Sequence, residues 1–104
     1  MAMNPQAMMK QAKKMQRKME EAQAALADET VEATAGGGMV TATVTGDQRL
    51  VSLAIDPEAI DPDDAELLCD TIVAAVNQGL EDSKELANQR LNAATGGMSI
   101  PGLM

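Results

Sequence analysis

The sequence predicts an α+β domain in which two long helices flank a three-stranded antiparallel meander, in the order α-β-β-β-α. Two observations predict this fold. The beginning and the end of the chain carry apolar residues at helical spacing, whereas the middle alternates apolar residues with threonines between glycine-containing turns. The chain has 104 residues, enough for one domain and too few for two, so we expect a single domain over residues 1–104.

The first helix is expected from about residue 5 to residue 27. Pro5 suits the first turn of a helix, where a missing N–H costs nothing. An apolar stripe then follows at alternating steps of four and three residues, and we call it the methionine seam: Met8, Ala12, Met15, Met19, Ala22 and Leu26. Because the stripe is narrow and the helix long, part of this helix should meet another helix or project from the domain.

Three strands are expected in the middle of the chain, at residues 30–35, 39–45 and 50–55. The second strand alternates threonines with an apolar set that predicts one buried face, namely Val40, Ala42 and Val44. Gly36–Gly38 and Gly46–Asp47 predict the turns, and Asp56–Pro57 ends the third strand. The triple glycine lacks the Lys-Ser/Thr of a phosphate loop, so a hairpin connection is the favoured interpretation, with a mobile loop that reaches a partner as the alternative.

The second helix is expected from about residue 64 to residue 94. The acidic residues 61–64 suit the positive end of the helix dipole, and Gly96–Gly97 suits the other end. Residues 72–76 are apolar on all sides, which predicts burial against both the sheet and another chain. Gly79 could bend the helix, and the tail at 96–104 is expected to be mobile unless it docks.

Charge is distributed unevenly along the chain. The net charge is −8, but five bases precede the first acid: Lys10, Lys13, Lys14, Arg17 and Lys18. Most of them lie opposite the methionine seam on the expected helix. A solvated face and a contact with phosphates both fit this run, and the remaining chain is strongly acidic.

The composition excludes several classes of function. Without His, Phe, Tyr or Trp, the chain lacks imidazole acid–base catalysis, imidazole metal ligands and aromatic stacking of bases. The acids between residues 56 and 64 are interrupted by prolines and do not follow a calcium loop, so capping is favoured over a metal site. Cys69 is the single cysteine and is expected to be a small core residue in a reducing cytoplasm. We expect no enzyme activity, cofactor, metal, small-molecule substrate or membrane span.

A core without aromatic side chains is small for this chain length, so burial shared between two copies is expected. The predicted homodimer interface takes residues from the seam and from the centre of the second helix: Met8, Met15, Met19, Ile72, Val73 and Val76.

Four segments, at residues 8–19, 36–40, 66–77 and 95–102, together resemble the YbaB/EbfC family of bacterial nucleoid-associated proteins. The resemblance covers nearly the whole chain. It implies a tweezer-like homodimer with projecting helices that binds duplex DNA with little sequence preference, in the cytoplasm at the nucleoid, and it implies no enzyme. The chain departs from the family pattern at Gln78 and Gly79, where an acidic residue and an alanine are common.

The favoured function is therefore a nucleoid-associated protein that contacts phosphates through the five bases of the first helix. The alternative is a homodimeric protein-interaction scaffold in which the methionine seam binds a partner and DNA contact is incidental. Salt distinguishes the two, because phosphate contacts weaken steeply with salt and apolar contacts do not.

Overall fold

The computed structural model describes residues 4–94 and 96. The elements follow in the order α1 (Pro5–Leu26), β1 (Thr30–Ala35), β2 (Val40–Thr45), β3 (Leu50–Ile55), two short 3-10 helices (Pro57–Ala59 and Pro62–Asp64) and α2 (Ala65–Ala94). The three strands form one antiparallel sheet in the order β1-β2-β3. The predicted α-β-β-β-α order and the meander are confirmed.

The element bounds differ from the predicted ones in three places. Met39 belongs to the turn before β2, because Gly36, Gly37 and Gly38 all adopt positive φ and the Met39 N–H closes the turn onto Gly36. Residues 62–64 form a 3-10 turn, so α2 begins at residue 65, and α1 ends one residue earlier than predicted. The tail expected to be mobile lies, apart from Gly96, outside the described residues.

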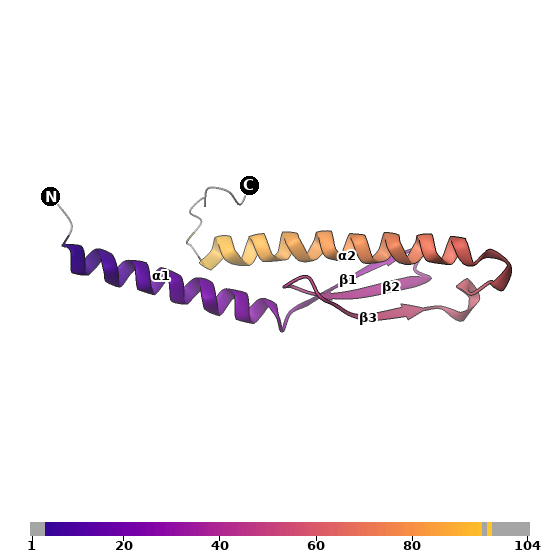
Figure 1. Cartoon of the computed structure of the whole chain (residues 1–104), viewed down its shortest axis with the longest axis horizontal. Coiled ribbons are helices and arrows are strands. Elements are labelled where there is room, and N and C mark those ends of the chain that lie inside the picture. Colours follow the sequence, from indigo (N-terminus) through magenta and orange to yellow (C-terminus); the bar gives the residue numbers. More distant parts are fainter. Residues whose placement is uncertain (1–3, 95, 97–104) are drawn as a thin grey trace.

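The core lies between the sheet and one face of α2. This helix covers β1 and β2 (Figure 1). The buried apolar residues on the sheet are Ala33, Val40, Ala42 and Val44, and the predicted alternation in β2 is thus confirmed. Ala75 is the buried apolar residue that α2 contributes. Residues 72–76 were predicted to be buried against both the sheet and another chain. Within one chain Ile72 and Val76 are half-buried and Val73 is 57% exposed, because only one face of α2 meets the sheet. Their burial against another chain stays a prediction.

Gly79 brings α2 close to β2. It is buried, and a Cβ added to it would lie 2.7 Å from Cγ2 of Val44. The helix is continuous through this position and runs straight (Figure 1), so the bend that Gly79 could cause does not occur. One turn later, the buried Ser83 hydroxyl donates a 2.6 Å hydrogen bond to the carbonyl of Thr45.

We expect Gly79→Ala to lower the free energy of unfolding by about 1 kcal/mol, because overpacking at Val44 outweighs the gain in helix propensity. The measurement is chemical denaturation at equilibrium. Ala74→Gly, at an exposed position of the same helix, calibrates the propensity difference in this chain. A Gly79→Ala protein that is stabilised by the full propensity difference would show that the contact with Val44 is not tight.

The molecule is elongated, with principal extents of 73 × 23 × 16 Å. The second half of α1 lies beside the last turns of α2, while its first half projects beyond the end of α2 as an arm (Figure 1).

Candidate nucleic-acid interface

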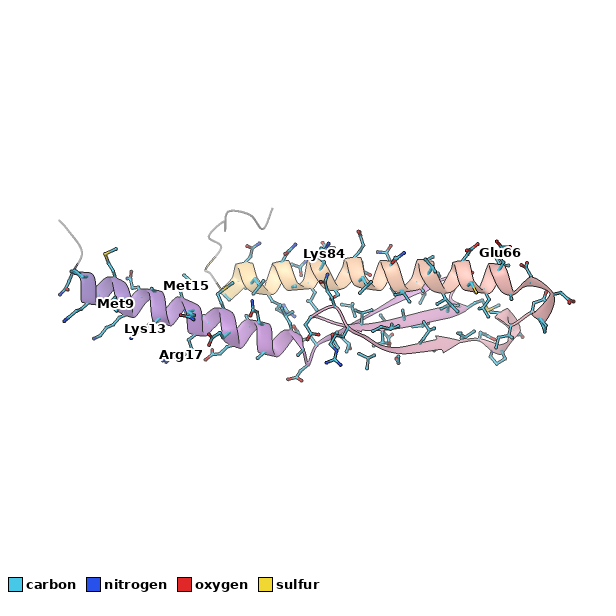
Figure 2. The ribbon with its side chains drawn as sticks, viewed as in Figure 1. Met9, Lys13, Met15, Arg17, Glu66 and Lys84 are labelled. Atoms are coloured by element: carbon cyan, nitrogen blue, oxygen red, sulfur yellow. The ribbon has the colours of Figure 1, made fainter. Side chains whose placement is uncertain are left out.

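The five bases of α1 lie on the projecting helix and form a surface that we call the basic face: Lys10, Lys13, Lys14, Arg17 and Lys18. All five are exposed. The helix that carries them is rich in good helix formers, and it begins with Pro5 and an Asn4 side chain that caps the N–H of Gln6 at 2.9 Å. Lys13 and Arg17 lie on the side of α1 that faces away from α2 (Figure 2). The prediction that these five bases lie exposed on one helix is therefore confirmed.

No carboxylate of the described residues lies within ion-pair distance of the basic face. Among residues 4–94 and 96, the one ion pair with an N···O distance within 4 Å joins Arg90 to Glu29, neither of which belongs to the basic face. The carboxylate of Glu20 instead accepts a 3.4 Å hydrogen bond from the amide of Gln16. An anion that approaches the arm therefore meets five ammonium or guanidinium groups with no competing carboxylate in contact.

The methionine seam becomes progressively more buried toward the C-terminal end of α1. Met8 is 54% exposed, Met15 and Met19 are half-buried, and Leu26 is buried. The methionine seam is thus partly covered by the chain itself where α1 lies against α2. It is exposed along the projecting half of α1.

The remaining bases lie on the body of the molecule. Arg49 and Lys84 are exposed. Arg90 makes a bidentate contact with Glu29, in which Nη2 donates to Oε1 at 2.8 Å and Nε donates to Oε2 at 3.0 Å. These hydrogen bonds lower the pKa of the Glu29 carboxyl and raise the pKa of Arg90. Sequence reasoning missed this pair, whose members are 61 residues apart and carry no local signal.

The acids between β3 and α2 act as helix caps, as predicted. Side chains of Asp56, Asp61 and Asp64 accept backbone N–H groups of Glu58, Asp63 and Leu67 at 2.9, 3.0 and 3.3 Å. Within the described residues, no three His, Cys, Asp or Glu side chains gather in a way that could hold a metal ion. Glu66, beside these caps, lies at the opposite end of the molecule from Lys13, so the capping acids are far from the basic face (Figure 2).

Cys69 is exposed, so its predicted place in the core is wrong for the single chain. The side of α2 that meets the sheet carries Ala75, Gly79 and Ser83, and Cys69 lies outside it. Neither helix, over the residues that the structure describes, is apolar and long enough to cross a membrane.

An elongated α+β protein with a row of exposed bases on a projecting helix is suited to bind a polyanion. The chain belongs to the YbaB/EbfC DNA-binding family, whose pattern its residues 1–98 match, and this family is non-catalytic. The assignment made from the sequence is confirmed.

Relatives of high identity agree with this assignment, and a solved structure shares the fold. A nucleoid-associated protein of Alkaliphilus metalliredigens is 48% identical over 98% of this chain and 90% of its own length, and one of Syntrophobacter fumaroxidans is 50% identical over 91% and 86%. The crystal structure of the uncharacterized protein HP0035 from Helicobacter pylori has the same fold, with a TM-score of 0.73 at 24% identity over 91% of this chain and 97% of that one.

Proposed function

We propose that the chain is a nucleoid-associated protein that binds duplex DNA through the basic face of α1, as a homodimer with two arms and with little sequence preference. The observation that supports this proposal is the row of five exposed bases on a projecting helix without a carboxylate in contact. The relatives named above are nucleoid-associated proteins, which supports the same function.

The chemistry of the basic face favours phosphates over bases. Lys10 and Lys18 are separated by roughly 12 Å of helix, a length over which a duplex presents several phosphates. Contacts of this kind position a protein on DNA without reading its sequence. Outside the five bases the chain carries three bases against sixteen acids, so repulsion should confine the DNA to the arm.

An apolar surface next to the core supports the homodimer. The register pairs Val44 with Leu50 and Ala42 with Leu53, which puts both leucines on the face of the sheet that α2 covers. However, α2 lies over β1 and β2, so Leu53 stays 36% exposed and Leu50 46% exposed. Within the described part of the chain, no element covers the β3 edge of this face.

The neighbouring side of α2 carries apolar residues beside polar ones. Leu80 lines a hollow together with Asn77, Glu81 and Lys84 of α2 and Gln48 of the β2–β3 turn, so this side of α2 looks toward β3. Val73 lies on the same side, one turn before Asn77. We call the surface formed by Leu50, Leu53, Val73, Val76 and Leu80 the α2–β3 face.

A second copy is the occupant that fits the α2–β3 face. The small core of one chain leaves this apolar surface uncovered, and an identical surface on a second copy can cover it about a two-fold axis. Among the residues predicted for the interface, Ile72, Val73 and Val76 lie on or beside this face. Met15 and Met19 are already half-covered within their own chain, so from the seam Met8 is the residue most available to a partner.

The test measures binding of the full chain to two unrelated duplexes of equal length at several salt concentrations, with sedimentation of the protein alone. We expect a dimer, similar affinities for both duplexes, and a log–log salt slope of about −0.9 for each phosphate contacted. Absence of binding, or binding that is insensitive to salt, would overturn the proposal and favour the protein-interaction scaffold.

A further inference from the structure

The junction between α1 and the body is built from specific contacts. Leu26, the last residue of α1, is buried. The Gly46 N–H is shared between the carbonyl oxygens of Leu26 at 2.9 Å and Glu29 at 2.8 Å, and a Cβ on Gly46 would lie 2.7 Å from the Leu26 oxygen. The two backbones therefore cross too closely for the C-terminal end of α1 to shift, and this end acts as a pivot.

The pivot and the apolar contacts leave the direction of α1 poorly determined. On the methionine seam, Met15 and Met19 are half-buried, and methionine side chains adapt to small displacements. Gln23 and Leu26 of α1 line a cavity of about 430 Å³ together with Asn88 and Leu91 of α2. A contact with defined geometry is needed to choose one direction.

We propose that the Glu29–Arg90 pair is a positioning contact that holds α1 at one angle to α2, and thereby aims the basic face at the duplex; this rests on the function proposed above. Glu29 lies in the junction itself: the N–H groups of Ala27, Asp28 and Glu29 donate to the carbonyls three residues earlier, at 3.3, 3.1 and 3.3 Å, so the turn that ends α1 continues to Glu29. Arg90 belongs to α2, which packs on the sheet. The bidentate contact therefore fixes the orientation, relative to α2, of the turn from which α1 leaves the body.

The length of the arm makes a small change of angle important. Lys10 lies roughly 24 Å along the helix from Leu26, so a tilt of about 10° moves it by about 4 Å. Successive phosphates of one strand are separated by about 3.4 Å along the duplex axis. A modest tilt at the pivot is therefore enough to take a base of the arm from one phosphate to the next.

The experiment exchanges the charges of the pair. The variants are Glu29→Arg, Arg90→Glu and the double exchange, with Lys84→Glu as the matched control on the same helix. The first readout needs neither DNA nor a dimer: the distance between spin labels at Met8→Cys and Ser52→Cys within one chain, in a Cys69→Ser background diluted with unlabelled protein. The second readout is the affinity for duplex DNA at one salt concentration.

We expect each single exchange to broaden the label distance and the double exchange to restore the original distribution. Arg90→Glu should lower the DNA affinity about five-fold beyond the effect of Lys84→Glu, which is a factor that an exposed bidentate pair can supply. The double exchange should restore the DNA affinity. Unchanged distances in the single variants, or no recovery in the double variant, would overturn the proposal. Affinity that stays low in the double variant while distances recover would make Arg90 a phosphate contact instead. If the parent protein binds no DNA, the proposed function fails, but the label distances still show whether the Glu29–Arg90 pair holds the angle of α1.

Discussion

Replacing Lys10, Lys14 and Arg17 together with Gln is expected to leave the fold intact and to lower the affinity for duplex DNA by at least about ten-fold near physiological salt. All three side chains are exposed and have no ion-pair partner within the described residues, so folding loses no contact. Glutamine also keeps nearly the helix propensity of Lys and Arg. Each protomer loses up to three phosphate contacts, and the salt slope should flatten by up to about 0.9 for each of them.

A pair of matched variants shows whether position or total charge matters. Lys10→Gln with Arg17→Gln removes one lysine and one arginine from the basic face, and Lys84→Gln with Arg49→Gln removes the same two residue types from the body. We expect the first pair to flatten the salt slope and the second to leave it nearly unchanged. Equal effects from both pairs would mean that the body shares the DNA contact, and the basic face would then be an ordinary solvated surface.

The parts of the fold that depend on local pattern could be predicted from the sequence. Alternation of Val40, Ala42 and Val44 with threonines places β2 and its buried face, because successive strand residues point to opposite sides of a sheet. The Gly36–Gly38 turn could be predicted from its three glycines, because glycine adopts without strain the positive φ angles that the turn requires. The basic face could be predicted in the same way, because helical spacing alone places its five bases on one side of α1.

What could not be predicted depends on which surfaces meet in space. Residues 72–76 are apolar on every side, so helical periodicity cannot say which side the sheet covers and which side it leaves for another chain. Gly79 indicated a place where the helix could bend, because the sequence does not show that Val44 lies against it. The Glu29–Arg90 contact joins residues 61 positions apart, and no local signal marks either member.

The dimer proposal leads to the second large effect, at Val73. Because Val73 is 57% exposed in the single chain, Val73→Asp should change the stability of an isolated chain by no more than about 0.5 kcal/mol. In a two-fold interface the substitution occurs twice, and it buries two unpaired carboxylates against an apolar surface. Val73→Asp is therefore expected to convert the dimer into a folded monomer of 10.9 kDa at micromolar concentration, measured by sedimentation and circular dichroism.

DNA binding should fall with the dimer, because two linked arms gain about 100-fold in affinity over a single arm. Met8→Asp is the matched control: Met8 is 54% exposed and lies on the methionine seam, away from the α2–β3 face. We expect Met8→Asp to weaken the dimer less than Val73→Asp does, because Met8 lies in the projecting half of α1 and not next to the core. If Met8→Asp dissociates the protein and Val73→Asp does not, the seam is the interface and the α2–β3 face has another occupant. If both variants stay dimeric and bind DNA like the parent, neither apolar surface holds the two copies together.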